Sequence, residues 1–338
     1  MAPVPDGRPV LIVRPGDGRG RVGRESGAVI EFLRSQDVDP VVVLAARRGE
    51  GGRRARAAID SGERFLVAVG GDGLVREVAD AILGSGTAGL VTMAVVAAGS
   101  GCDFVRTFGL PGDARTAAPR LLTGVAYPID AVRVTCRGED GEPRTTHFAG
   151  VARVGFGGVA QRRAARLPRW MGRARYFGSF WSSVATFRPV EIRVVADERE
   201  YRGPAHDVVV GNTQHALDGI PVSPRSFPGD GVLDVLVMRG PTSDQFRLLP
   251  TMMWGEQVPS PGVVELRVRA KLRVECAKAL WVEADTEPLG RTPAEFRKMS
   301  IPGGISCPNG ELALRIGAIA PNPRTKIVVN CAGRTRSC

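Results

Sequence analysis

Hydrophobic residues in the first third of the chain form short apolar runs that alternate with segments of helical periodicity. The runs predict strands at residues 9–13, 40–44, 65–69 and 90–96, and a further strand over 127–134. The helical segments are 26–36, 74–83, 104–108 and 114–123, with one more at the end of the basic stretch 47–60. Strands that alternate with helices predict a doubly wound, three-layer α/β domain, whose ligands bind at the carboxyl ends of the strands.

The pattern changes at about residue 131, after which short stretches of alternating apolar and polar residues predominate. They predict strands at 131–136, 145–152, 190–196, 205–211, 232–238, 263–269, 271–276 and 279–284. Turn sequences such as Glu139-Asp140-Gly141 separate them, so an antiparallel, sandwich-like β domain is expected. We therefore predict a first domain over 8–131, completed by about 312–330, and a second domain over 132–311 that includes one helical segment, 161–187.

Glycine-rich turns follow several of the predicted strands in the first domain. The turn Gly70-Gly71-Asp72-Gly73 leads into a helix, which places free backbone N–H groups where an anion is favoured. Glycine also lets a ligand approach the backbone closely. Asp72 is unusual in such a turn, and we interpret it as a carboxylate that orients a metal ion or water beside phosphate groups. Two further glycine-containing turns lie at 14–20 and 97–103.

Composition narrows the class of protein. The 338 residues suit two domains, and the 43% apolar and 24% charged shares are those of ordinary globular proteins. The formal net charge of +11 indicates an anionic partner, namely nucleic acid, a membrane surface or a phosphorylated substrate, or else a coding bias toward Arg. No apolar run has membrane-spanning length, the N-terminus lacks a signal-peptide pattern, and the Cys residues show no disulfide or zinc spacing. A cytoplasmic location is therefore expected.

Several segments resemble the motifs of one known family. Residues 69–78 (VGGDGLVREV) and 99–106 (GSGCDFVR) resemble its two glycine-rich motifs. Asp130 lies where the family has an Asp at the domain crossing, and residues 230–234 (DGVLD) resemble its DGxLD passage. Asp285-Thr286-Glu287 lies where the family has D-G-E. Over most of its length the chain thus resembles the diacylglycerol-kinase-type lipid kinases, which include bacterial soluble lipid kinases and have sphingosine and ceramide kinases as relatives.

The resemblance implies ATP-dependent phosphorylation of a lipid hydroxyl, with Mg²⁺, in a cleft between the two domains. It assigns the general base to Asp285, or to Glu287 beside it, and counts Asp72 among the catalytic residues. Phosphoryl transfer needs such a carboxylate to accept the hydroxyl proton, together with positioning and charge neutralisation. The nucleotide-binding residues that it implies are Gly18, Gly70, Gly71, Asp72, Gly73, Leu74, Glu77, Gly99, Ser100, Gly101 and Asp103.

The same resemblance implies two magnesium sites. Asp72, Asp103 and Asp130 would hold the catalytic Mg²⁺ through water, because Mg²⁺ keeps several waters and takes few carboxylates. A structural Mg²⁺ would be bound by Asp230 and by the backbone carbonyls of Phe227 and Val232. From the residues alone, the alternatives are a helix N-cap for Asp103 and a plain hairpin turn for Asp230.

The chain departs from the family pattern at several positions. Leu74 stands where the family has Thr, Cys102 where it has Asn, and Thr286 where it has Gly. The lost Thr and Asn favour one alternative, a non-catalytic nucleotide- or lipid-binding relative. Another alternative is an NAD-kinase-like small-molecule kinase, since that family also carries GGDG. The retained acidic residues favour an active lipid kinase.

Residues 161–187 combine arginines with aromatic side chains on a predicted helix. This composition suits an anionic membrane surface; the alternative is a helix that covers one face of the second domain, with its arginines in solvent. The expected partner is a lipid substrate at an anionic membrane surface, reached by peripheral membrane association. Nucleic acid is not expected, because no recognised binding motif accompanies the charge. The sequence leaves a homodimer open.

Overall fold

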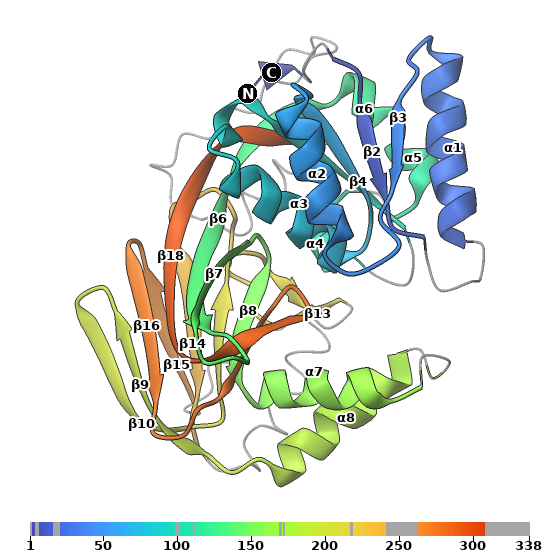
Figure 1. The fold of residues 1–338 in the computed structure, drawn as a ribbon. Helices are drawn as coiled ribbons and strands as arrows, with labels where there is room; N and C mark the ends of the chain where they lie inside the picture. Colours follow the sequence, from blue (N-terminus) through green and yellow to red (C-terminus); the bar gives the residue numbers. More distant parts are fainter. Residues whose placement is uncertain are drawn as a thin grey trace, which may run out of the picture.

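The computed structural model describes residues 2–3, 7–15, 21–98, 102–110, 112–168, 171, 173–216, 219–240 and 262–307, and it has two domains (Figure 1). In the first domain, parallel strands lie in the order β5-β4-β2-β3. Their bounds are β2 (Val10–Val13), β3 (Val41–Leu44), β4 (Phe65–Gly70) and β5 (Thr92–Ala97). The helices of this domain are α1 (Arg21–Ser35), α2 (Glu50–Asp60), α3 (Asp72–Gly84), α4 (Asp103–Thr107), α5 (Ala114–Ala117) and α6 (Arg120–Thr123), with the 3₁₀ turn η1 (Ala88–Leu90).

Two hydrophobic clusters cover the two faces of the parallel sheet. Successive side chains of a strand point to opposite faces. Leu66 and Ala68 of β4 accordingly belong to the cluster that contains α2 and α3. Phe65 and Val67 belong to the cluster that contains Leu33 of α1. The sheet therefore lies between helical layers, and the predicted doubly wound α/β arrangement is confirmed.

The second domain is antiparallel, as predicted. Its strands are β6 (Val125–Arg137), β7 (Pro143–Phe148), β8 (Val151–Gly155), β9 (Val190–Ala196), β10 (Arg199–Ala205), β11 (Asp207–Gly211), β14 (Leu233–Met238), β15 (Val263–Val268), β16 (Lys271–Cys276) and β17 (Trp281–Ala284), with the two-residue strands β12 (His215–Ala216) and β13 (Ile220–Pro221). A separate core of buried aliphatic residues and the ring pair Phe148 and Phe296 fills this domain.

One long strand, β18 (Glu287–Cys307), joins the domains and was not predicted. It pairs antiparallel with β17, β16 and β6 in the second domain. At its far end Ile305 pairs in parallel with Met93 of β5, so β18 reaches the first sheet. The short strand β1 (Ala2–Pro3) pairs with β6 nearby. The return that we predicted at 312–330 lies outside the described residues.

Some predicted boundaries are wrong. The single helix expected over 161–187 is two helices, α7 (Phe156–Arg166) and α8 (Arg173–Thr186). The break begins at Leu167, which is extended because Pro168 disfavours a helical conformation in the residue before it. The helix expected over 114–123 is likewise divided into α5 and α6 at Pro119. Among the described residues, no helix is both long and apolar enough to cross a membrane.

The strand expected over 145–152 is also two strands, β7 and β8. Between them, the backbone N–H groups of Ala149 and Gly150, and that of Val151 at the start of β8, point to the carboxylate of Asp285. A side chain from a distant hairpin therefore takes hydrogen bonds that a continuous strand would have used. This interruption forms one wall of the candidate site.

Candidate active site

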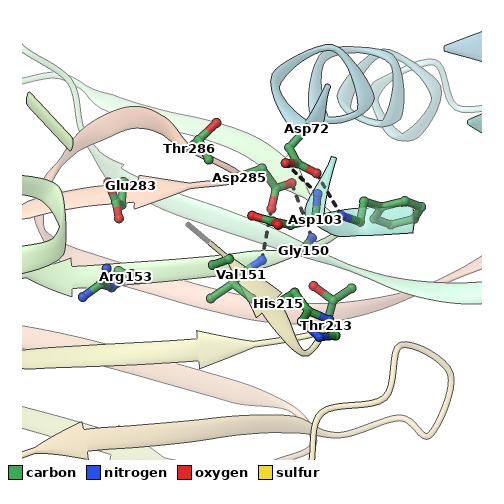
Figure 2. Close-up of a pocket in the computed structure, with 12 residues that line it drawn as sticks. Asp72, Asp103, Gly150, Val151, Arg153, Thr213, His215, Glu283, Asp285 and Thr286 are labelled. Atoms are coloured by element: carbon green, nitrogen blue, oxygen red, sulfur yellow. Dashed lines mark hydrogen bonds between the residues drawn. The ribbon is translucent and has the colours of Figure 1, made fainter. Parts of the chain in front are cut away.

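A pocket lies between the two domains, and Figure 2 shows its lining. Asp72, Asp103 and Phe104 come from the first domain. The second domain contributes Gly150, Val151, Arg153, Thr213, His215, Ala216, Glu283, Asp285 and Thr286. The sequence-predicted residues Asp72, Asp103 and Asp285 are thus brought together, although they are far apart in the chain.

Asp72 is fixed at the junction of two neighbouring strand ends. β4 and β5 run parallel with Gly70 opposite Ala97, and the helices that follow them, α3 and α4, begin close together. Asp72 begins α3, and its carboxylate accepts hydrogen bonds from the backbone N–H groups of Asp103 and Phe104, both at 2.9 Å. Burial raises the pKa of Asp72, while these N–H groups act in the opposite direction. The carboxylate therefore caps α4 and faces the pocket in one orientation.

Asp285 lies at the tip of the hairpin between β17 and β18. Asp285 and Thr286 both have positive φ, 47° and 66°, and form a two-residue turn between the paired residues Ala284 and Glu287. The Asp285 carboxylate accepts from the N–H groups of Ala149 at 3.2 Å and Val151 at 3.0 Å. Burial, followed by the nearby charge of Asp72, raises its pKa to about 7. A carboxylate with this pKa can accept a proton near neutral pH.

The pH dependence of the reaction is expected to follow Asp285. Because its pKa is raised to about 7, the carboxyl stays protonated at pH values where an ordinary Asp is already ionised. Only the ionised form can accept a proton, so kcat/KM should fall about tenfold per pH unit below about pH 7 and level off above it. The measurement is kcat/KM from about pH 5 to pH 9. A flat profile down to about pH 5 would rule out this base.

Thr286 is strained in the hairpin turn, where the family pattern has Gly. A β-branched residue at φ 66° is in the left-handed region that glycine occupies readily. We expect Thr286→Gly to raise the free energy of unfolding by about 1 kcal/mol, and Thr286→Ala to raise it less. Denaturant unfolding of both variants measures this. A glycine variant no more stable than the alanine variant would contradict the account.

Glu287 faces the glycine-rich turn and is not among the pocket-lining residues. A Cβ at Gly73 would lie 3.0 Å from Glu287 Oε1, so the two are in close contact. Glu287 Oε2 is 2.9 Å from Nε of Arg48, and burial is the largest cause of its raised pKa. Of the two carboxylates predicted as the general base, Asp285 is therefore the one that lines the pocket.

The other predicted nucleotide residues have different places. Glu77 is buried; it forms an ion pair with half-buried Arg14 at 2.7 Å and accepts from the N–H of Gly49 at 2.8 Å, so it links three segments behind the turn. Leu74 is 1% exposed and packs in the hydrophobic core, so the position where the family has Thr serves packing here. Gly18, Gly99, Ser100 and Gly101 lie outside the described residues, and their roles stay predictions.

The three carboxylates predicted for the catalytic Mg²⁺ do not share one pocket. Asp72 and Asp103 line it, but Asp130 does not; its carboxylate is 2.9 Å from Nζ of Lys298. Among the residues that the structure describes, no group of three or more His, Cys, Asp and Glu side chains is arranged to hold a metal ion. Binding of Mg²⁺ through water by Asp72 and Asp103 stays a prediction.

Sequence reasoning missed a buried charge cluster on the pocket wall. Arg153 donates from two nitrogens to Asp207, and all of these atoms are buried. Glu283 faces the pocket beside Arg153 (Figure 2), and burial raises its pKa to about 7. The signal that could have found Glu283 was a charged residue within the otherwise apolar strand β17, since a buried charge needs a partner or a function.

The chain matches known proteins along nearly all of the described region. Residues 8–134 match the family model of the diacylglycerol kinase catalytic domain, and 150–307 match that of the YegS C-terminal NAD kinase beta sandwich-like domain. A protein named "Probable lipid kinase YegS-like" from Pseudomonas aeruginosa (strain PAO1) is 32% identical over 285 residues, covering 83% of this chain and 88% of that one. A protein named "Diacylglycerol kinase" from Mycobacterium tuberculosis (strain H37Rv) is 28% identical over 296 residues, covering 86% and 92%.

A solved structure of a diacylglycerol kinase from Bacillus anthracis str. Sterne has the same fold, with a TM-score of 0.67, 20% identity and coverage of 89% of this chain and 97% of that chain. The fold and the two domain matches together define a kinase of the two-domain type. With a relative at 32% identity over most of its length, the chain belongs to the diacylglycerol-kinase-type family of lipid kinases, and it is an enzyme of that family. The names of these relatives refer to lipid kinases and not to NAD kinases, which favours a lipid kinase over the NAD-kinase-like alternative.

Proposed function

We propose that this enzyme transfers the γ-phosphoryl group of ATP to a hydroxyl of a lipid, either diacylglycerol-like or of the sphingoid or ceramide type. The observation that carries the proposal is the meeting of Asp72, from the glycine-rich turn, and Asp285, from the second domain, in one interdomain pocket. Phosphoryl transfer needs a nucleotide held at one wall and a base at the other. The names of the relatives support a lipid acceptor.

In the proposed reaction Asp285 accepts the proton of the lipid hydroxyl. The hydroxyl oxygen then forms a bond to the γ-phosphorus, the bond from that phosphorus to the bridging oxygen breaks, and ADP leaves. The N–H groups of Ala149, Gly150 and Val151 hold the Asp285 carboxylate in place during this step. When bound, Mg²⁺ neutralises the phosphate charge, and Asp72 and Asp103 are the residues of this pocket that would hold it through water.

The test is phosphate transfer from radiolabelled ATP to a panel of lipids that contains diacylglycerol, a sphingoid base and ceramide. The proposal predicts label in at least one lipid, and no label when magnesium is removed. Label in NAD, with none in any lipid, would favour the NAD-kinase-like alternative. The panel also identifies the acceptor.

Membrane contact through α7 and α8 is the second part of the proposal. These helices lie at the edge of the second domain, away from the first (Figure 1). Several of their arginines, among them Arg162 and Arg163, make contacts within the protein. Arg162 lies 3.8 Å from the Trp281 ring centroid, and Arg163 donates to Thr186 at 2.9 Å. Arg166 of α7 is exposed, and we propose that its side chain contacts the anionic surface.

We expect the protein to sediment with vesicles that contain an anionic lipid more than with neutral vesicles. Arg166→Glu should reduce this binding, because the reversed charge is repelled by the anionic surface. Arg199→Glu on β10 is the matched control, an exposed arginine on another edge of the domain. Equal sedimentation with both kinds of vesicle would remove membrane attraction from the proposal and leave the kinase activity untouched.

A further inference from the structure

The ammonium group of Lys298 lies in a cage of oxygen atoms at the junction of the two domains. Lys298 is on β18, opposite Val132 of β6. Its Nζ is 2.9 Å from Oδ2 of Asp130 and 3.4 Å from Oδ1 of Asp230, and it donates to the backbone carbonyl of Val232. The side chain is 4% exposed, so this charge has been removed from water.

Two members of this cage are groups that the family resemblance assigns to a structural Mg²⁺, namely Asp230 and the Val232 carbonyl. The third predicted ligand, the Phe227 carbonyl, accepts a hydrogen bond from the N–H of Gly229 at 2.9 Å. Asp230 is also 3.2 Å from Nη2 of Arg267, so its carboxylate already faces two cations. Lys298 and Arg267 therefore balance the negative charge of Asp230 that a metal ion would otherwise neutralise.

The geometry leaves no place for a divalent ion among the same oxygens. An ammonium group has three donors, and here three acceptors surround it, from Asp130, Asp230 and Val232. Mg²⁺ needs near-octahedral oxygen ligands at about 2.0–2.1 Å. An ion bound to these oxygens would lie against the ammonium group, where two like charges in a buried site repel strongly. The residues present do not fit a structural magnesium.

We propose that Lys298 takes the place of the structural metal ion, so that the domain junction of this protein is held without a divalent cation. Asp130 is central to the junction. Its N–H donates to the Pro228 carbonyl at 3.3 Å, and its carboxylate accepts from the N–H of Gly231 at 3.0 Å. Lys298 thus ties β18 and β6 to the loop that ends at Val232. The inference concerns stability and stands whether or not the proposed reaction is correct.

Wild-type protein without nucleotide gives the first test. After dialysis, the metal content and the melting temperature are measured with and without excess EDTA, and again with added Mg²⁺. We expect no bound divalent ion per chain, and a melting temperature that neither EDTA nor Mg²⁺ changes. One retained divalent ion per chain, or a melting temperature that falls in EDTA, would overturn the proposal.

Lys298→Met gives the second test, because it removes the ammonium group and keeps much of the side-chain volume. It leaves Asp130 buried without its cation, so the melting temperature should fall on the order of 10 °C and recover in part when Mg²⁺ is added. Lys271→Met is the matched control, since Lys271 is 45% exposed and pairs with Glu295 at 2.9 Å on the neighbouring strand β16. A Lys298→Met protein as stable as wild type would contradict the inference. If this variant does not fold, the wild-type experiment decides alone.

Discussion

Asp285→Asn will reduce kcat by about 10²–10⁴-fold while the protein stays folded. The asparagine side chain has the same shape, but its single oxygen can accept either from Val151 or from Ala149 and Gly150, because these N–H groups donate to different oxygens of the Asp285 carboxylate. It cannot accept the proton of the acceptor hydroxyl. The removal of a buried charge raises stability and the loss of an acceptor for one N–H lowers it, so the melting temperature near pH 8 should stay close to that of wild type. Kinetics and thermal unfolding on the same preparation measure the two effects.

Asp197→Asn is the matched control for this variant. Asp197 also has positive φ, 51°, in a two-residue hairpin turn. Its carboxylate also accepts from three backbone N–H groups, those of Arg269, Ala270 and Lys271. It is exposed and does not line the pocket, and its carboxyl pKa is lowered rather than raised. Activity should survive in Asp197→Asn; equal losses in both variants would show that the Asp285 effect is structural.

Asp72→Asn will reduce kcat by about 100-fold or more, because it removes a fixed negative charge from the pocket wall where phosphate and metal are proposed to bind. The variant also replaces the carboxylate that accepts from the N–H groups of Asp103 and Phe104. Each carboxylate oxygen accepts from one of these N–H groups and asparagine has a single oxygen, so one hydrogen bond is lost and the free energy of unfolding should fall by about 1 kcal/mol. Steady-state kinetics and denaturant unfolding measure the two losses.

A second capping residue separates these two effects. Asp113 accepts from the N–H of Thr116 at 2.9 Å at the start of α5, and it is exposed. Asp113→Ala removes this cap, so it should lose about 1 kcal/mol of stability and keep its activity. If Asp72→Asn loses stability but keeps wild-type kcat, then Asp72 is a cap and nothing more, and its assignment to the phosphate side is wrong.

The sequence predicted the parallel strands well because each is a short, fully apolar run, such as β4 between charged Arg64 and the glycine turn. β18 was not predicted because its sequence contains Pro288, Pro293 and Pro302, which normally indicate turns. The structure accommodates two of them at register shifts, between Arg291 and Glu295 and between Ser300 and Gly304. Local sequence cannot show that a strand continues across such irregularities.

The site was predictable where a motif marked it and not elsewhere. Asp72 and Asp285 stand in recognisable turns, so their roles could be proposed before their meeting was seen. Lys298 and Arg153 are charged residues in strands that carry no recognisable motif, and only the pairing of distant strands brings them to Asp130 and Asp207. Glu287 was predicted together with Asp285 as a candidate base, but its side chain faces Gly73 and Arg48 and not the pocket.

The most direct test of the central claim is the transfer of labelled γ-phosphate from ATP to a lipid, with wild type, Asp285→Asn and Asp197→Asn compared side by side. We expect a labelled lipid with wild type and with Asp197→Asn, and a loss of about 10²-fold or more in rate with Asp285→Asn. An undiminished rate in Asp285→Asn would contradict the proposed base. Absence of labelled lipid with the wild-type protein, across the whole panel, would contradict the proposed lipid kinase reaction itself.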